Sequence, residues 1–304
     1  MAFDADALVD RRRLKRKLAV WRVLAIVALV AVVAVAVGRM PVTLPGQSHV
    51  AVLHVDGLIV GDPRRDDAVR AVADDNSARA LLVRIDSPGG TTYGSESLYR
   101  ALRVVAEVKP VVAVMDGVAA SGGYMTAIAA DRIYARESTI TGSIGVIMEA
   151  TNFVGLMDML GIESESIKSG PLKAEPNPLS RMTPEAREAA QGLVMEIYDM
   201  FVGMVAERRG MTLADARTLA DGRVYTGISA ARLGLIDGLG GDAEAREWLE
   251  QAHGIAASLP ERDVSIEYPE ELFDRLVSSF MGKSHIRERL SLDGLVSLWH
   301  PSVN

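Results

Sequence analysis

The chain has 304 residues and no cysteine, and 49% of its residues are hydrophobic. This length allows one large domain or two small ones, and the lack of cysteine excludes both disulfide bonds and a thiol nucleophile. Residues 1–39 carry eight Lys or Arg and three Asp or Glu, for a net charge of +5, whereas the remainder carries 25 and 37, for −12. An acidic body without a basic stripe disfavours nucleic-acid binding.

The N-terminal segment combines a basic flank with a long apolar run. Residues 1–17 contain six closely spaced basic residues, and residues 18–38 are uncharged apart from Arg22. A run of ~20 apolar residues is long enough to cross a bilayer as a helix, and the basic flank predicts that the N-terminus stays in the cytoplasm. The alternative is a signal peptide cleaved at Ala34–Ala36, although most signal peptides have shorter apolar runs of ~7–15 residues. Both interpretations predict that the body after Arg39 is exported.

Residues 39–48 contain Pro, Gly and Ser and are typical of a linker. An alternating pattern of predicted strands and helices begins at residue 49 and leads to a domain that ends near residue 254. Short apolar runs, nearly continuous at 80–85, predict buried parallel strands at 49–55, 80–85, 111–115, 132–135 and 144–148. A further strand is predicted at 162–168. Apolar residues at helical spacing predict intervening helices at 65–75, 95–108 and 122–130. This alternation indicates right-handed βαβ crossovers and a mostly parallel sheet in an α/β fold.

The later part of the chain is predicted to be helical. The start signals of a long helix are an N-cap threonine, a proline at the first helical position and an acid in the first turn, at Thr183, Pro184 and Glu185. This helix is predicted to run to Arg209 and to end at Gly210. Shorter helices are predicted at 213–220, 229–233 and 243–253. The tail 255–304 has apolar residues at helical spacing, which suit a neighbouring subunit, a membrane or the chain's own core, at Phe273, Leu276, Val277 and Phe280.

Ser121 is the leading candidate for catalysis. It lies between a predicted buried strand and an apolar helix, among small residues that let a substrate backbone approach. The N–H of Gly122, at the start of this helix, points to where an oxyanion would form, and the helix dipole favours negative charge there. The alternative is a serine that only caps the helix, which is the commoner role of a serine at this position.

A second glycine turn supports the catalytic interpretation. Gly89 and Gly90 follow the predicted strand 80–85, at the edge of the sheet where sites gather in open α/β folds. Two glycine turns that end consecutive parallel strands can direct their N–H groups to one point, as an oxyanion hole requires. The alternative is an ordinary Pro-Gly turn.

A serine nucleophile needs a base, and histidine is absent between His54 and His253. A lysine serves as base when burial favours its neutral form, in which case activity is expected to rise with pH. Lys173 and Lys168 are both candidates, and their spacing does not distinguish them. Ser143, in a Gly-Ser-Ile-Gly turn, is a candidate to orient the amine; the alternative is a plain turn serine.

These segments, in this order, resemble the signal peptide peptidase A family of membrane-anchored Ser–Lys peptidases, in its short single-domain form. The resemblance covers roughly residues 50–242. Each segment alone is a weak signal, and six in the same order make the resemblance specific. The matching segments are 56–57, 86–90, 119–124, 141–146, 168–173 and 222–241. One departure is Ala174, where many relatives have an acid directly after the base lysine.

The resemblance implies a crotonase/Clp-like fold and assigns the roles residue by residue. Ser121 is the implied nucleophile, Lys173 the base in preference to Lys168, and Ser143 the residue that positions the lysine. The implied oxyanion hole consists of the N–H groups of Gly90 and Gly122. No metal or other cofactor is implied.

The resemblance also predicts where the protein acts and with what. Relatives form homo-oligomeric rings in which neighbouring subunits help to complete the sites. The implied substrates are signal peptides left in the bacterial inner membrane, with the catalytic domain on the extracytoplasmic side. The alternatives are a Ser–Lys protease of stomatin-like scaffold proteins and a non-catalytic membrane assembly factor. A Clp-like Ser–His–Asp protease is disfavoured by the missing histidine, and a crotonase-type acyl-CoA enzyme by export of the body.

Overall fold

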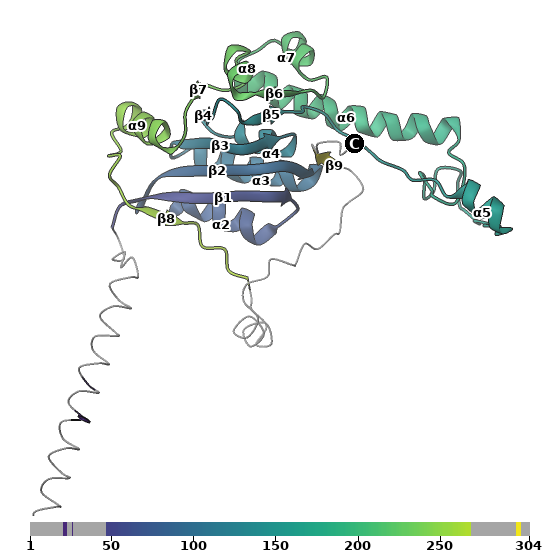
Figure 1. Cartoon of the computed structure of the whole chain (residues 1–304), viewed down its shortest axis with the longest axis horizontal. Coiled ribbons are helices and arrows are strands. Elements are labelled where there is room, and N and C mark those ends of the chain that lie inside the picture. The colour runs from purple at the N-terminus through teal and green to yellow at the C-terminus, as the bar shows by residue number, and fades with distance from the viewer. Residues whose placement is uncertain (1–20, 23–25, 27–46, 269–295, 299–304) are drawn as a thin grey trace, which may run out of the picture. The chain divides into compact units, whose positions relative to one another are not determined.

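The computed structural model describes residues 21–22, 26, 47–268 and 296–298 (Figure 1). The chain divides into a first unit, Met1–Gln47, and a second unit, Ser48–Asn304. The predicted basic segment 1–17, nearly all of the predicted anchor 18–38 and the predicted apolar face at 273–280 lie outside the described residues. The fold described below is that of the second unit.

Within the described residues, nine strands form one sheet in which parallel pairing dominates. Its centre consists of β1 (His49–Ile59), β2 (Ala78–Thr91) and β3 (Val111–Ala120), paired in parallel. Further parallel pairs involve β4 (Arg132–Ala135), β5 (Ile140–Gly142), β7 (Gly238–Leu239) and β8 (Glu261–Asp263). Two pairs are antiparallel, namely β6 (Val224–Thr226) with β5 and β9 (Val296–Leu298) with β2. The predicted α/β fold with a mostly parallel sheet is therefore confirmed.

Helices cover both faces of this sheet (Figure 1). Successive side chains of a strand point to opposite faces, and the two sets pack into separate apolar clusters. Leu53, Leu81 and Val83 belong to the cluster that includes residues of α2 (Pro63–Asp74), α3 (Thr92–Ala106) and α4 (Gly122–Ala127). The intervening residues Val52 and Leu82 belong to the cluster that includes residues of α9 (Asp242–His253). Burial on both faces explains why these strands read as continuous apolar runs.

The long helix α6 (Pro184–Arg209) has the ends that its sequence predicts. The Thr183 side chain accepts a hydrogen bond from the N–H of Ala186 at 3.2 Å, and Gly210 ends the helix in the left-handed conformation at φ 62°. Two shorter helices follow, α7 (Leu213–Leu219) and α8 (Gly227–Arg232). Cap chemistry at both ends therefore located this helix correctly.

Two predicted strands are wrong. Residues 162–168 form no strand, and of residues 144–148 only one forms an isolated bridge. The sheet instead contains the shorter β5, which ends where Gly142 and Ser143 take positive φ values of 81° and 49°. The apolar run after Ser143 leaves the sheet, and four of its residues line a cavity described below. Periodicity alone does not distinguish a buried strand from an apolar segment that borders a cavity.

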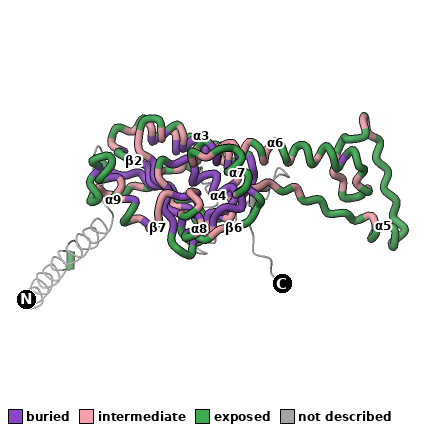
Figure 2. Tube along the Cα trace, turned by 90° about the horizontal axis from the view of Figure 1, so that it is seen from above, coloured by how far each residue is buried: buried purple, intermediate pink, exposed green. Residues whose placement is uncertain are grey.

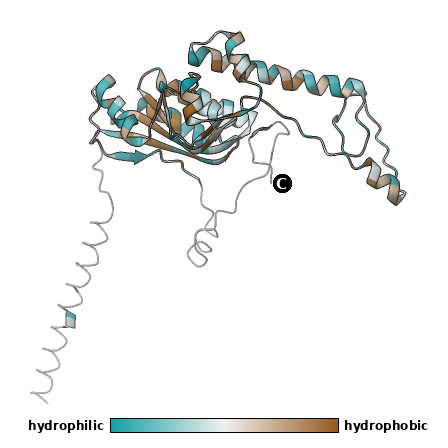
Figure 3. Ribbon diagram, turned by 45° about the horizontal axis from the view of Figure 1, so that its top comes forward, coloured by the Kyte–Doolittle hydropathy of each residue, from teal (hydrophilic) through white to brown (hydrophobic). Residues whose placement is uncertain are grey.

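The segment between β5 and α6 contains a helix that the sequence analysis did not predict, α5 (Val154–Leu160). None of its residues is buried, although most are apolar (Figure 3).

The N-terminal part of α6 is also exposed (Figure 2), whereas Phe201, Val202 and Val205 of the same helix are buried in the core. Among the described residues, α6 is the single helix that is long enough and apolar enough to cross a membrane, a test of length and composition alone. The burial of these three side chains indicates that the C-terminal half of α6 packs on the core of the domain.

Candidate active site

Ser121 occupies a strained junction between β3 and α4. Its φ of 54° and ψ of −114° are costly for a residue with a side chain. The backbone holds this conformation at both ends, because the Ser121 N–H donates to the Gly142 carbonyl at 2.8 Å and its own carbonyl accepts from the Met125 N–H at 2.9 Å. Although Ser121 is at the N-cap position, its side chain makes no capping hydrogen bond to α4. The capping alternative is therefore excluded, and strain of this kind is typical of functional sites.

The glycine turn at the end of β2 is fixed to both neighbouring strands. The Ser87 hydroxyl donates to the Gly57 carbonyl of β1 at 2.6 Å and accepts from the Gly89 N–H at 3.1 Å. On the other side, the Asp86 carboxylate accepts from the Val118 N–H of β3 at 2.9 Å. The aspartate and the serine of this segment therefore lock the turn in place before the two glycines.

The two glycine turns meet, as the sequence analysis expected. A methyl group on Gly122 would lie 3.2 Å from the backbone nitrogen of Gly90 and would overlap the hydroxyl of Ser95. Ser95 is a fully buried residue of α3, and its hydroxyl has no hydrogen-bond partner among the described residues. Gly122 is therefore required by space, and the two glycine turns approach each other closely next to Ser121.

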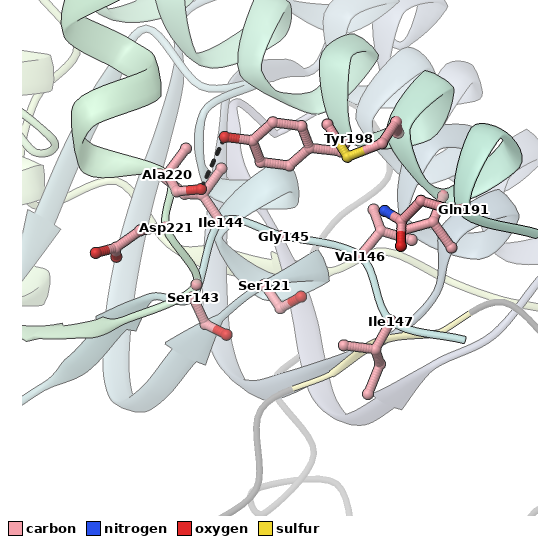
Figure 4. Close-up of a pocket in the computed structure, with 13 residues that line it drawn as sticks. Ser121, Ser143, Ile144, Gly145, Val146, Ile147, Gln191, Tyr198, Ala220 and Asp221 are labelled. Carbon is pink, nitrogen blue, oxygen red and sulfur yellow. Dashed lines mark hydrogen bonds between the residues drawn. The ribbon is translucent and has the colours of Figure 1, made fainter. Parts of the chain in front are cut away.

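Ser121 and Ser143 both line a cavity of about 570 Å³ (Figure 4). Both residues are buried, with 1% and 8% of their surface exposed. Ser143 is held by its own N–H, which donates to the Arg223 carbonyl at 2.8 Å. The other lining residues are mostly apolar and come from the segment after β5, from α6 and from the loop after α7: Ile144, Gly145, Val146, Ile147, Gln191, Val194, Met195, Tyr198, Ala220, Asp221 and Gly222.

The contribution of α6 to this cavity was missed by the sequence analysis. Gln191, Val194, Met195 and Tyr198 have the spacing i, i+3, i+4 and i+7, so they share one face of the helix. The Tyr198 hydroxyl donates to the Ala220 carbonyl at 2.9 Å and joins α6 to the loop after α7 (Figure 4). The spacing was visible in the sequence, but nothing there showed which cavity the face lines.

The charged groups at the rim of the cavity are paired. The two carboxylate oxygens of Asp221 accept from Arg223 Nε, at 2.9 and 2.7 Å. This contact lowers the pKa of Asp221 below its ordinary value. Burial, followed by the charge of Asp221, raises the pKa of the nearby Tyr225. Over residues 47–268, no group of three or more His, Asp or Glu side chains is arranged to hold a metal ion.

Lys173 does not line the cavity that contains Ser121. It lies in an exposed turn, where its N–H donates to the Gly170 carbonyl at 3.2 Å, before Ala174 at a positive φ of 62°. Lys168 is engaged elsewhere, because its Nζ lies 2.6 Å from Glu175 Oε1. Within this one chain, the structure thus brings together Ser121, Ser143, Gly90 and Gly122, but neither lysine.

A backbone segment pairs with the glycine turn. Strand β9 runs antiparallel to the end of β2, with Ser297 opposite Gly90 and Leu298 opposite Gly89. The edge of the sheet beside Ser121 therefore accepts an extended chain in the antiparallel direction.

Comparison with known proteins places this chain in a family. Residues 103–256 match the model of peptidase family S49. A protein of Synechocystis sp. named as a protease (slr0021) is 38% identical over 229 residues, which cover 75% of this chain and 82% of that protein. The chloroplastic serine protease SPPA of Arabidopsis thaliana is 34% identical over 84% of this chain. Protease 4 of Haemophilus influenzae is 30% identical over 72%. The matches cover only 36% and 37% of the last two proteins.

Solved structures show weaker likeness. A 1510-N membrane-bound stomatin-specific protease mutant gives a TM-score of 0.49 at 15% identity, over 73% of this chain and 99% of that chain. A ClpP1 mutant from Listeria monocytogenes gives 0.41 at 14% identity, over 62% and 91%. Because both TM-scores lie below 0.5, the fold assignment rests on the strand order and pairing given above.

Proposed function

This chain belongs to peptidase family S49, the family of signal peptide peptidase A and protease 4, and is a serine peptidase; from that premise we propose that Ser121 is its nucleophile and Lys173 its general base. In this proposal Gly90 and Gly122 donate their N–H groups to the oxyanion, and Ser143 positions the lysine. The observation that carries the proposal is the strained, buried Ser121 beside two converging glycine turns, at a cavity, with no capping role.

The proposed chemistry proceeds through an acyl-enzyme. The amine of Lys173 takes the proton of Ser121 as the serine oxygen attacks the peptide carbonyl. The oxyanion accepts hydrogen bonds from Gly90 and Gly122, and the resulting ammonium gives its proton to the leaving amine. Water then attacks the ester, the lysine takes a proton from it, and return of that proton to Ser121 releases the new carboxyl terminus. Loss of one oxyanion donor typically lowers kcat by about 10²–10³.

We propose further that Lys173 reaches Ser121 from a second copy of the chain in a homo-oligomeric ring. Three observations support this arrangement. Lys173 is exposed, it lies outside the Ser121 cavity, and it forms no ion pair within residues 47–268. The segment around it also exposes apolar side chains that a second copy would cover, including Phe153, Leu156, Met159, Leu160, Ile167 and Leu172.

The proposed substrates are extended peptides. Pairing of β9 with Gly89 and Gly90 supports this mode of binding, because a substrate strand in the same place would bring a carbonyl beside Gly90 and Ser121. The substrate class that we propose is signal peptides left in the membrane after preproteins are processed. The proposed location is the bacterial inner membrane, with residues 18–38 as a single span and the catalytic domain outside the cytoplasm. Family membership also supports our assignment of the sheet to the crotonase/Clp-like fold.

The experiment for the nucleophile is covalent labelling of the full chain with a fluorophosphonate, followed by mass mapping of the modified residue. The proposal predicts modification of Ser121, and none in the Ser121→Ala variant. Modification of another serine, or none in a correctly assembled protein that also hydrolyses no peptide, would overturn it. That last outcome would favour a non-catalytic assembly factor, while cleavage of a purified stomatin-like protein but not of signal peptides would favour the scaffold-protein alternative.

A further inference from the structure

We infer that Thr141 is a positioning residue for the proposed reaction, because its hydroxyl holds the end of β3 where the strained conformation of Ser121 requires it. The inference rests on the proposed function, in which Ser121 is the nucleophile. Thr141 is the middle residue of β5, is fully buried, and does not line the Ser121 cavity. It therefore acts through its neighbours and not on the substrate.

The Thr141 hydroxyl is bonded to the chain just before the nucleophile. Thr141 Oγ1 donates to the carbonyl of Ala119, two residues before Ser121, at 2.7 Å. The carbonyl of Gly142, the next residue of β5, accepts from the Ser121 N–H at 2.8 Å. These two bonds lie on either side of Ala120 and tie successive residues of β5 to the end of β3. Strand β5 thus fixes the direction in which the chain enters Ser121.

This restraint matters because Ser121 has a φ of 54°, which is costly for a residue with a side chain. Such a conformation persists only where the surrounding structure determines it. The bonds of the Ser121 N–H and carbonyl to Gly142 and Met125 are backbone bonds, which most residues at these positions would also make. The bond to Ala119 is different, because it depends on the side chain at position 141.

Strand β5 can serve as a fixed point because its other side is held by β6. A methyl group on Gly142 would lie 2.5 Å from the ring of Tyr225, so the two backbones are already in close approach. The next N–H along the chain, that of Ser143, donates to the Arg223 carbonyl at 2.8 Å. The end of β5 is therefore enclosed between β3 and β6, and the hydroxyl of Thr141 pulls on the β3 side.

The same restraint connects the two serines of the cavity. Ser143 lies two residues after Thr141, and Ser143 and Ser121 both line the cavity (Figure 4). In the proposed reaction Ser121 attacks and Ser143 positions the lysine, so their spacing affects the alignment of nucleophile and base. A misplacement of about 1 Å costs about 10² in rate. Loss of the hydroxyl should therefore lower kcat and leave KM nearly unchanged, because substrate binding does not use it.

Thr139 provides a matched control. It is buried, lies two residues before Thr141, and its hydroxyl donates to the carbonyl of Asp116 of β3 at 2.6 Å. This is the same kind of bond between the same two parts of the chain, but Asp116 lies five residues before Ser121. Thr139 Oγ1 also accepts from the Arg136 N–H at 2.9 Å. Thr139→Val therefore removes more hydrogen bonds than Thr141→Val, at a greater distance from the nucleophile.

The experiment compares Thr141→Val, Thr141→Ser and Thr139→Val in the full-length oligomer. Valine has nearly the shape of threonine but no hydroxyl, whereas serine keeps the hydroxyl. The measurements are kcat and KM for one peptide, the rate at which a fluorophosphonate labels Ser121, and the melting temperature. Thr141→Val should lower kcat and the labelling rate by roughly tenfold to a hundredfold, with KM changed by less than about threefold. Thr141→Ser should restore both rates to within about threefold of the wild type.

Thr139→Val should lower the melting temperature at least as much as Thr141→Val and keep kcat within about threefold of the wild type. A kcat of Thr141→Val within about threefold of the wild type would overturn the inference and leave the proposed function intact. Equal losses of kcat in Thr141→Val and Thr139→Val would also overturn it, because a loss that follows stability shows a structural role. Thr141→Ala, with the same expected result, replaces Thr141→Val if that variant does not assemble. A wild type that is not labelled at Ser121 and hydrolyses no peptide would instead count against the proposed function.

Discussion

Lys168 Nζ lies 2.6 Å from Glu175 Oε1, whereas Lys173 forms no ion pair within residues 47–268. The hydrogen bond from Lys168, with the charge of that lysine, lowers the pKa of Glu175 below its ordinary value. The amine of Lys168 is therefore already occupied by an ion pair within its own turn. This contact is in line with our proposal that Lys173, rather than Lys168, is the base, on grounds that sequence spacing did not provide.

The first prediction compares the two lysines. Lys173→Ala should lower kcat by about 10³ or more because the proposed base is lost. Lys168→Ala should keep kcat within about threefold, because only an ion pair of the turn is lost. The measurement is steady-state hydrolysis of one peptide by both variants, with assembly checked by sedimentation. Equal losses in the two variants would show that the turn as a whole matters, or that Lys168 is the base.

A second prediction concerns the origin of the lysine. If Lys173 acts on Ser121 of a second copy, a mixture of Ser121→Ala and Lys173→Ala subunits contains sites with an intact serine and an intact lysine. Unfolding and reassembly of the two inactive variants together should then restore up to about a quarter of wild-type activity, by random mixing at a pairwise site. Each variant reassembled alone is the control. An inactive mixture with normal assembly would place serine and lysine in the same subunit.

The third prediction uses the contact between Gly122 and Ser95. Gly122→Ala should abolish activity or folding, because its methyl group would overlap the Ser95 hydroxyl. Ser95→Ala alone should not lower the melting temperature, because the hydroxyl has no hydrogen-bond partner among the described residues. The double variant should regain folding, because the nearest remaining contacts are then 3.1 Å to Cβ of residue 95 and 3.2 Å to Gly90 N. Thermal unfolding of the three variants checks this, and failure of the double variant to recover any stability would contradict the contact.

The fourth prediction concerns the start of α2. The Asp62 carboxylate accepts from the N–H groups of Arg64 and Arg65 and from the Tyr268 hydroxyl at 2.5 Å. Burial raises the pKa of Asp62, but these hydrogen bonds and the charge of Arg65 outweigh it and hold the pKa below its ordinary value. Burial, and then the bond to Asp62, raises the pKa of Tyr268 to about 12, so the hydroxyl remains a donor. A lowered folded-state pKa contributes stability above the unfolded-state pKa, and that contribution is lost as pH falls through the folded-state pKa.

Two substitutions separate the cap from the charge. At pH 7, Asp62→Ala should lower the free energy of unfolding by about 1 kcal/mol, the usual value of an N-cap. Asp62→Asn keeps the cap and should lose less. The difference in the free energy of unfolding between the wild type and Asp62→Asn should disappear as the wild-type carboxylate becomes protonated at low pH. Chemical unfolding at pH 7 and near pH 3 measures this difference. A difference that stays constant with pH would show that the charge of Asp62 does not contribute to stability.

Much of the fold was predictable because local signals and tertiary packing agree in it. The caps at Thr183 and Gly210 located α6, and continuous apolar runs located the central strands because both faces of the sheet are buried. The apolar run at 144–148 was wrongly predicted to be a strand because it has the same kind of sequence. Its apolar residues border a cavity, and only the positive φ of Ser143 shows where the sheet ends.

In the site, the residues at strand ends were predictable, and those on α6 were not. Ser121, Ser143, Gly90 and Gly122 lie at strand ends, and parallel strands bring their ends together at one edge. The α6 face was not predicted, because a helical stripe reveals its spacing but not its partner. Nor does a single chain show what surrounds Lys173, which is exposed until another molecule covers it.

The most direct test of the central claim is hydrolysis of an apolar peptide by the assembled full-length protein, measured across pH beside Ser121→Ala, Lys173→Ala and Lys168→Ala. The account predicts that activity disappears in the first two variants with fold and assembly intact, persists in the third, and rises with pH in the wild type when chemistry limits the rate. Full activity in the correctly folded Ser121→Ala or Lys173→Ala variant would contradict it.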